Sequence, residues 1–291
     1  MTTGIAWCSE TWNPVIGCTR VSAGCTRCYA ERMAARLATN PLAPEYEGVA
    51  EFTAGHNPRW LSVKTLPERL DQPLRWRKPR RVFVCSMADL FHDAVPDEFI
   101  AAVFGVMAAC PQHTFQVLTK RPARMVRWFE WVAADDKTAW IGNVADRCAQ
   151  DAWKESAAAV ELDELHVAWP LPNVHIGVSV EDQATADERI PLLLRTPAAV
   201  RWISAEPLLG PLDLAQFLSR TVRKPSLWVV CGAESGPGAR PMHPDWARAV
   251  RDQCAAAGVP LFVKQLTGEG GRAVKDVEQF PDDLRVREYP R

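Results

Sequence analysis

The stretch RVFVCSMAD, residues 81–89, decides the fold class, because it joins a short apolar run to a polar end. Apolar runs of roughly four to six residues have the length of a fully buried strand. The same form recurs in HTFQVLTKR at 113–121, NVHIGVSVE at 173–181, VRWISAEP at 200–207, LWVVCGAES at 227–235 and PLFVKQLTG at 260–268. Near-continuous apolar strands are typical of a parallel sheet that is covered on both faces.

Helical patterns occupy the gaps between these runs. Apolar side chains recur at spacings of three and four over residues 96–110, 184–194 and 245–257. Strands that alternate with helices indicate repeated βαβ units. A further strand near 11–17 brings the number of predicted strands to about seven. No GxGxxG motif follows this strand, and its absence from the sequence argues against a dinucleotide-binding sheet. We therefore predict an α/β fold, a complete or partial TIM-like (β/α) barrel of parallel strands with helical insertions.

Length and composition agree with one large domain. The chain has 291 residues, 47% of them hydrophobic, which suffices for a single barrel over 1–291. We expect insertions near 40–80, which is rich in Pro and Arg, and near 129–172, which is helical with an Ala-rich acidic stretch. A net charge of −1 gives no global signature of nucleic-acid or membrane binding. Because the chain has no apolar run of about 18 residues and no signal-peptide pattern, we expect no membrane association and a cytoplasmic location.

Three of the nine cysteines cluster near the start of the chain, in the pattern Cys18-x6-Cys25-x2-Cys28. In a reducing compartment, clustered cysteines serve metal or redox chemistry more often than disulfides. The x2 spacing lets one tight turn supply two ligands, and Gly17 and Gly24 let the first cysteine fold back onto it. Thiolates select zinc or iron–sulfur clusters. The other six cysteines are scattered singly, and those at 85 and 231 lie inside apolar runs and are predicted to be core residues.

The number of clustered thiols helps to distinguish a structural zinc site from an iron–sulfur cluster. A structural zinc site usually has four protein ligands, whereas an iron–sulfur cubane held by three thiolates leaves one iron open for a small molecule. The alternatives are a zinc site completed by a distant His56 or His92, or three unrelated buried thiols. Because the loop follows the first predicted strand and precedes a predicted helix over 29–39, we expect the metal on the catalytic face of the barrel.

Polar residues close the other predicted strands and would converge on that face. They are Ser86 and Asp89; Thr119, Lys120 and Arg121; Ser179, Glu181 and Asp182; Ser204 and Glu206; Glu234 and Ser235; and Lys264 and Gln265. Charged residues are rarely buried unless paired, so their convergence predicts a polar cavity. Lys120, Arg121 and Lys264 are suited to a carboxylate or phosphate. The alternative is that each group caps its own loop or the next helix.

Two basic tracts contain an aromatic residue each. RWRKPRR at 75–81 includes Trp76, and residues 120–128 carry Arg121, Arg124, Arg127 and Trp128. Basic side chains beside aromatic ones suit a nucleic-acid groove. A solvated helix face and a strand lead-in are the alternative reading.

The three-cysteine loop resembles that of the radical S-adenosylmethionine superfamily. The longer pattern, TWNP, GC, S-x-GC-x2-CYAE, LTKRP, GVSVED, SAEPLLG, CGAESG and VKQLTG, resembles an uncharacterised family of phage and prophage proteins with a radical-S-adenosylmethionine-like core. The loop departs from the commonest superfamily spacing, C-x3-C-x2-C, by three extra residues. Arg27 precedes the third cysteine where the superfamily usually has an aromatic residue, and Tyr29 follows it.

The resemblance implies a [4Fe–4S] cluster on Cys18, Cys25 and Cys28 that binds S-adenosylmethionine at its open iron. It implies a 5′-deoxyadenosyl radical for hydrogen abstraction, with a nucleic acid or nucleotide as the expected substrate, and a reductant protein such as flavodoxin or ferredoxin. No catalytic side chain is assigned. The cofactor-binding residues expected at the strand ends are Ser86, Asp89, Ser179, Glu181, Glu206, Glu234 and Lys264. Two other functions stay open: a zinc-stabilised nucleic-acid-binding protein and a non-catalytic iron–sulfur protein.

Overall fold

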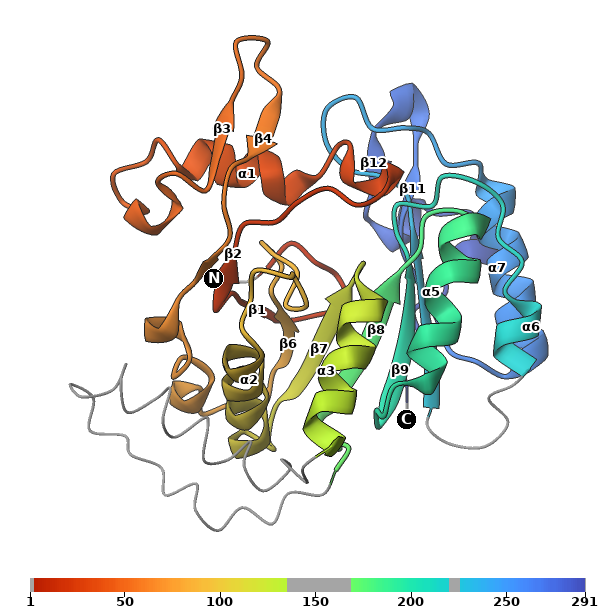
Figure 1. The fold of residues 1–291 in the computed structure, drawn as a ribbon. Coiled ribbons are helices and arrows are strands. Elements are labelled where there is room, and N and C mark those ends of the chain that lie inside the picture. The colour runs from red at the N-terminus through yellow and green to blue at the C-terminus, as the bar shows by residue number, and fades with distance from the viewer. Residues whose placement is uncertain (1–2, 135–168, 220–225, 291) are drawn as a thin grey trace. The chain divides into compact units, whose positions relative to one another are not determined.

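The computed structural model describes residues 3–134, 169–219 and 226–290 (Figure 1). The chain divides into two compact units. The first comprises Met1–Thr19 and Ala30–His175, and the second comprises Arg20–Tyr29 and Ile176–Arg291. A short segment around the second and third clustered cysteines therefore belongs with the C-terminal half of the chain.

The largest sheet in the described part of the chain has eight strands in the order β1-β6-β7-β8-β9-β10-β11-β12. Its strands are β1 (Glu10–Trp12), β6 (Arg81–Val84), β7 (Thr114–Thr119), β8 (Val174–Ser179), β9 (Val200–Ala205), β10 (Ser226–Gly232), β11 (Leu261–Thr267) and β12 (Ala273–Val274). The pairs β1–β6, β6–β7, β9–β10 and β10–β11 are parallel, and β12 is antiparallel to β11. The structure thus confirms an α/β fold with a mostly parallel sheet, and the six strands predicted after the first.

The predicted first strand over 11–17 is wrong as a single element. It consists of β1 and of β2 (Val15–Ile16), which pairs antiparallel with β5 (Lys64–Thr65) in a separate small sheet. Asn13 and Pro14 interrupt the strand because proline has no N–H to give to a ladder. The Pro14 carbonyl accepts a hydrogen bond of 2.7 Å from the N–H of Leu66, the residue that follows β5.

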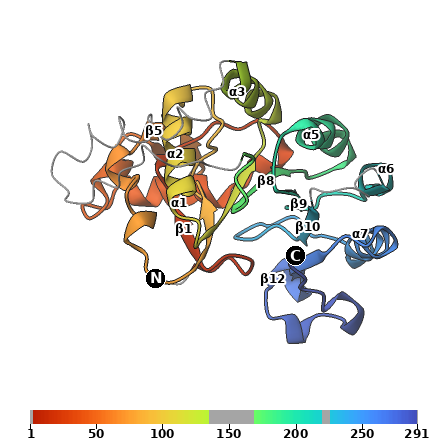
Figure 2. The ribbon, with the colours of Figure 1, turned by 90° about the horizontal axis from the view of Figure 1, so that it is seen from below.

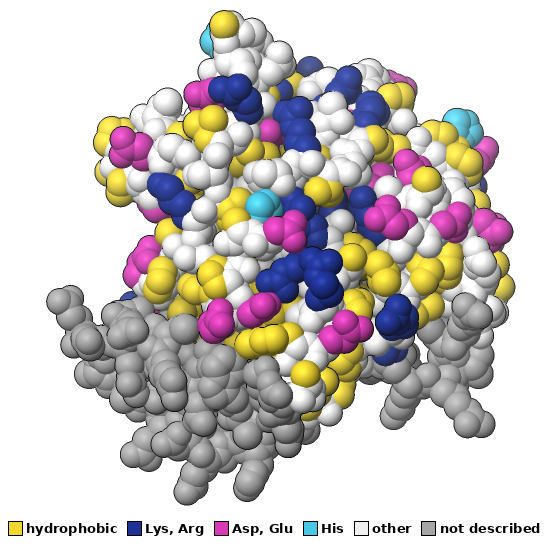
Figure 3. Space-filling model, viewed as in Figure 1, with side chains coloured by type: hydrophobic (Ala, Val, Ile, Leu, Met, Phe, Trp, Pro, Cys, Tyr) yellow, Lys and Arg dark blue, Asp and Glu magenta, His cyan; other side chains and the backbone are white. Residues whose placement is uncertain are grey.

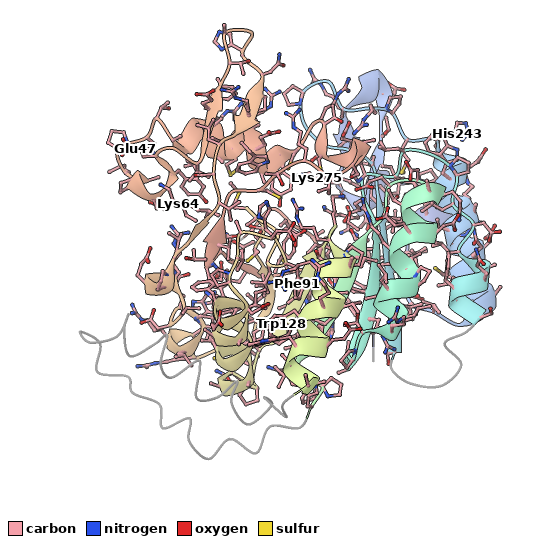
Figure 4. The ribbon with its side chains drawn as sticks, in the orientation of Figure 1. Glu47, Lys64, Phe91, Trp128, His243 and Lys275 are labelled. Atoms are coloured by element: carbon pink, nitrogen blue, oxygen red, sulfur yellow. The ribbon has the colours of Figure 1, made fainter. Side chains whose placement is uncertain are left out.

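The first unit buries its strands beneath helices α2 (Asp97–Ala109) and α3 (Pro122–Ala134). Helix α2 carries buried side chains on most of its surface, as expected of a helix packed on several sides. Phe104 lies 4.5 Å from Trp128 and Phe91 lies 6.1 Å from Trp128, measured between ring centroids. Phe91 and Trp128 are labelled in Figure 4. These aromatic rings form the core between helices and sheet.

The second unit places α5 (Gln183–Arg195), α6 (Ala215–Leu218) and α7 (Pro244–Ala257) on the same side of strands β9 and β10 (Figure 2). Asp182 begins α5 with a capping box shared with Thr185. His243 caps α7, and Gly258 ends it in the left-handed conformation, at φ 64°. The predicted helices over 184–194 and 245–257 are confirmed.

Residues 40–80 contain several small elements. They form β3 (Ala50–Phe52) and β4 (Pro58–Trp60), a hairpin fastened by the buried Glu31 of α1 (Tyr29–Leu37), whose carboxylate accepts the Trp60 N–H at 3.0 Å. Lys64 donates to the backbone carbonyl of Glu47 (Figure 4). Of the insertion predicted near 129–172, helix α3 already covers the start, and residues 135–168 lie outside the described residues. None of the described helices has the length and apolarity needed to cross a lipid bilayer.

Candidate metal centre and strand-end site

The cysteine segment ends in one tight turn. Cys25 closes the short 3-10 helix Ala23–Cys25, and the N–H of Cys28 donates to the carbonyl of Cys25 at 3.3 Å. Helix α1 begins at the next residue, Tyr29, as the sequence predicted. Cys18 belongs to the first unit, whereas Cys25 and Cys28 belong to the second.

The cysteines differ sharply in burial. Cys18, Cys25 and Cys28 are half-buried reduced thiols, whereas the other described cysteines are buried: Cys8, Cys85, Cys110, Cys231 and Cys254. Burial raises the pKa of Cys110 and Cys254 to about 12, and that of Cys85 and Cys231 further still. A thiol that stays protonated neither attacks nor binds metal readily. Cys85 and Cys231 are therefore core residues, as predicted, while Cys148 lies outside the described residues.

The donor set suits a thiophilic metal, although no site is ready-made. Within residues 3–134, 169–219 and 226–290, no group of three or more Cys, His, Asp or Glu side chains is already gathered as metal ligands. Three accessible thiols, two of them on one turn, nevertheless fit a zinc ion or an iron–sulfur cluster in chemical type. Metal sites of this kind commonly assemble as the metal binds, because ligands that are deprotonated repel one another without it. The residues present therefore fit such a group.

The histidines proposed for a zinc site are placed differently. His56 lies at an exposed turn of the β3–β4 hairpin, with φ 54°. His92 is buried beside the cysteine segment: its Nε2 lies 3.0 Å from the Thr19 hydroxyl, and its Nδ1 accepts the Ala94 N–H at 3.1 Å. Burial, and then the charge of Arg121, lower the pKa of His92. Both ring nitrogens of His92 therefore already have hydrogen-bond partners, Thr19 at Nε2 and Ala94 at Nδ1.

A partly exposed ion pair lies at the carboxyl ends of β9 to β11 in the second unit. Lys264 Nζ is 2.9 Å from Glu206 Oε1, and their side chains are 21% and 11% exposed. The Ser204 hydroxyl donates to Glu206 Oε2 at 3.3 Å, and the Ser179 hydroxyl donates to the Glu206 backbone carbonyl at 3.0 Å. A Cβ on Gly232 would lie 2.7 Å from Glu206 Oε1, so a larger residue at this position would displace the carboxylate. Four residues from the predicted strand-end set therefore meet here.

Glu181 lies deeper in the same unit and serves the fold. Its side chain is 0% exposed and pairs with Arg189 of α5 at 3.2 Å. Arg189 also donates to the Ser179 carbonyl at 2.7 Å. The Ser22 hydroxyl of the cysteine segment donates to Glu181 Oε1 at 3.0 Å. Sequence reasoning missed Arg189 and Ser22, since no local pattern signals a pairing between a helix interior, a strand end and a distant loop.

Glu234 is held by its own loop. The Arg240 N–H donates to Glu234 Oε2 at 2.8 Å, the Arg240 Nε donates to the same oxygen at 3.0 Å, and the rest of the guanidinium meets Oε1. Burial raises the pKa of this carboxyl, but the Arg240 hydrogen bonds and charge outweigh it and leave the pKa below its usual value. Gln265 donates to the neighbouring Ala233 carbonyl. Ser235 and Asp182 lie in the loops after β10 and β8, Asp182 as the cap of α5.

The strand ends of the first unit are joined by Asp89. Its carboxylate accepts the Thr119 hydroxyl at 2.8 Å, the Lys120 N–H at 3.0 Å and the Phe91 N–H at 3.0 Å. Ser86 donates to the Asn13 side chain at 3.1 Å. Assigning Ser86 and Asp89 to a cofactor stays a prediction, as does a single cavity for residues that are divided between the two units.

The basic tracts are interleaved with acidic partners. On α3, Arg124 pairs with Asp97 at 2.7 Å, and Arg127 lies 3.7 Å from Asp93. Lys and Arg side chains on the face seen in Figure 3 have Asp and Glu side chains beside them. In residues 75–81, Arg75 pairs with Asp71, and Arg80 pairs with Glu10 and stacks over Trp76, its guanidinium carbon 5.0 Å from the ring centroid. That tract precedes β6 and so lies at the amino end of this strand, opposite to the strand ends described above.

Comparison with known families gives a match over most of the chain. The chain belongs to the DUF5131 family. The match covers residues 2–282, and the family is described as a protein of unknown function. No curated protein and no solved structure matches the chain. The DUF5131 match therefore spans both units and the cysteine segment without assigning a reaction to either.

Proposed function

We propose that this DUF5131 protein is a radical S-adenosylmethionine enzyme, with a [4Fe–4S] cluster held by Cys18, Cys25 and Cys28. A nucleic acid or nucleotide is the substrate class that the phage-type resemblance favours, for a lyase or modification reaction. A flavodoxin or ferredoxin in the cytoplasm is the proposed electron donor. We also propose that the parallel strands belong to a complete or partial (β/α) barrel.

The observation that carries the proposal is the placement of the Cys25–Cys28 turn. In the second unit, this turn is tied to the loop after β8, through Ser22 and Glu181. Its Arg27 approaches Gly238 in the loop after β10: a Cβ on Gly238 would lie 3.8 Å from the Arg27 guanidinium. Chemistry in parallel α/β folds takes place at the carboxyl ends of strands, where these loops lie. Half-buried thiols at that edge are suited to a reactive centre rather than to the core.

The chain's own residues would bind and orient the reactants. When bound to Cys18, Cys25 and Cys28, the cluster would supply, together with S-adenosylmethionine, the radical chemistry needed to abstract a hydrogen atom from the substrate. The Lys264 ammonium is suited to a carboxylate and the Glu206 carboxylate to an ammonium or hydroxyl group, so this pair can orient an amino-acid moiety by exchanging partners.

Anaerobic reconstitution with iron and sulfide tests the proposal. We expect four irons with matching sulfide per chain, and 5′-deoxyadenosine release when the protein is reduced with S-adenosylmethionine present. Cys25→Ala should lose the cluster, whereas the matched variant Cys254→Ala, which changes a buried thiol, should retain it. A single zinc without iron would instead support the nucleic-acid-binding alternative, and a redox-active cluster that never cleaves S-adenosylmethionine would support the non-catalytic iron–sulfur alternative.

A further inference from the structure

We infer that Glu181 is a positioning residue that holds the Cys25–Cys28 turn in a metal-binding shape through Ser22 and Gly24. The inference rests on the proposed function only in requiring that a metal binds these cysteines. It reassigns Glu181, which the resemblance gave to S-adenosylmethionine, to a role beneath the cysteines.

A continuous row of polar contacts leads from the core of the second unit to the sulfur of Cys25. The Arg189 guanidinium meets the Glu181 carboxylate at 3.2 Å, and the Ser22 hydroxyl donates to that carboxylate at 3.0 Å. The Ser22 oxygen also lies 3.8 Å from Cys25 Sγ. Since the Ser22 proton is given to Glu181, its oxygen can accept from the Cys25 thiol in the apo chain, and Ser22 thereby joins Glu181 to the turn.

Gly24 brings the turn into direct contact with the same carboxylate. A Cβ at Gly24 would lie 2.5 Å from Glu181 Cγ and 2.6 Å from Oε1. No real Cβ reaches such distances, and Glu181 cannot retreat because Arg189 holds it in a fully buried position. An alanine at position 24 therefore lifts the turn away from Glu181 without touching either thiol.

Burial explains why an acid is used for this purpose. A buried carboxylate paired with a guanidinium occupies one fixed place, because moving either charge would leave the other uncompensated in a low-dielectric interior. Glu181 is also out of reach of a bound molecule, since its side chain is 0% exposed. A ligand-binding acid would need the accessibility that Glu206 retains.

The test uses the full apo chain and Cd²⁺ as the probe, which reports thiolate binding through charge-transfer absorption. We expect Gly24→Ala to weaken Cd²⁺ binding at least about tenfold, and Ser22→Ala to weaken it about fivefold, the loss of one ordering hydrogen bond. Ser22→Thr keeps the hydroxyl and should bind within about twofold of the unaltered chain. Gly210→Ala is the matched control, because nothing lies within 4 Å of a Cβ at that position of the same unit.

The outcomes separate this inference from the proposed function. If the unaltered chain binds neither Cd²⁺ nor iron, the proposed metal centre itself is absent. If the unaltered chain binds metal, and Gly24→Ala and Ser22→Ala match Gly210→Ala in affinity, the positioning role is overturned while the metal centre stands. Thermal unfolding of the apo variants is measured in parallel. A loss of affinity that follows unfolding in every variant, without rescue by Ser22→Thr, would also overturn the inference.

Discussion

Two strand ends of this protein carry an acidic side chain after similar apolar runs, and they use it differently. After β6, Asp89 is 6% exposed and accepts hydrogen bonds from two backbone N–H groups and the Thr119 hydroxyl. After β9, Glu206 meets the Lys264 ammonium and the Ser204 hydroxyl, both on side chains. We call the first a closed strand end and the second an open one. Backbone donors are fixed in place, whereas side-chain donors can turn toward a ligand, so the open end is the better suited to binding a ligand.

The largest expected effect is at the closed end. Asp89→Ala leaves buried donors without their acceptor, which should lower the free energy of unfolding by about 3 kcal/mol. Glu206→Gln, at the open end, should lower it by about 1 kcal/mol or less, because its partner is partly solvated. Urea unfolding of both variants checks the contrast, and equal losses would erase the distinction between the two ends.

Glu234 also accepts hydrogen bonds within its own loop, from Arg240. The pH dependence of stability should reveal their contribution. A carboxyl whose pKa is lowered in the folded state contributes stability above its unfolded pKa, which is lost as pH falls through the folded pKa. Glu234→Gln should therefore cost roughly 2 kcal/mol at neutral pH, and less as the pH falls below about 4. Chemical unfolding of the variant and the unaltered chain across this range measures the difference. A cost that does not change with pH would show that the Arg240 contacts do not depend on the charge of Glu234.

The affinity for S-adenosylmethionine should also differ between variants of the open and the closed strand end. Glu206→Gln should weaken S-adenosylmethionine binding about tenfold while cluster iron is retained, because one charge-assisted contact is replaced by a neutral one. Isothermal titration of the reconstituted protein measures the affinity, with iron content as the control. Asp89→Asn, which keeps one of the two acceptor oxygens and removes the charge, should leave the affinity within about twofold. A larger effect at Asp89 than at Glu206 would reverse our assignment of the two ends.

The smallest effect is expected at an exposed ion pair between α3 and the loop after β6. Arg127 and Asp93 are both mostly exposed and 3.7 Å apart, so Arg127→Ala should change the free energy of unfolding by no more than about 0.5 kcal/mol. If a nucleic acid contacts α3, the same variant should reduce the salt dependence of binding by about one phosphate contact. Fluorescence anisotropy with a labelled oligonucleotide at several salt concentrations measures this, and an unchanged slope would remove Arg127 from such a contact.

The parallel strands and the helices between them could be predicted well from the sequence, because each of them has a local sequence pattern. Continuous apolar runs mark β6 to β11, and Asp182 and His243 cap the helices that begin beside them. The division of 11–17 into two strands is not evident from the sequence, because the apolar residues on either side of Pro14 resemble one continuous run. The two-residue strand β12 was missed as well, because it is too short to show a period.

The roles of the strand-end acids could not be predicted in the same way. In sequence, Glu181, Glu206 and Glu234 look alike, each following an apolar run. Their uses are set by tertiary partners far along the chain: Ser22 for Glu181 and Lys264 for Glu206. Glu234 has a nearer partner in Arg240, but no spacing rule for loops marks that pair. Which of these three acids is buried depends on tertiary packing, and no single local sequence pattern determines that packing.

The most direct test is the electron paramagnetic resonance spectrum of the reduced, reconstituted protein, recorded with and without S-adenosylmethionine. A cluster held by three thiolates has one iron without a protein ligand, so S-adenosylmethionine should bind there and change the spectrum. We expect that change in the unaltered chain and in Cys254→Ala, with no cluster signal in Cys28→Ala. A cluster signal that is indifferent to S-adenosylmethionine, or one that survives in Cys28→Ala, would contradict the account.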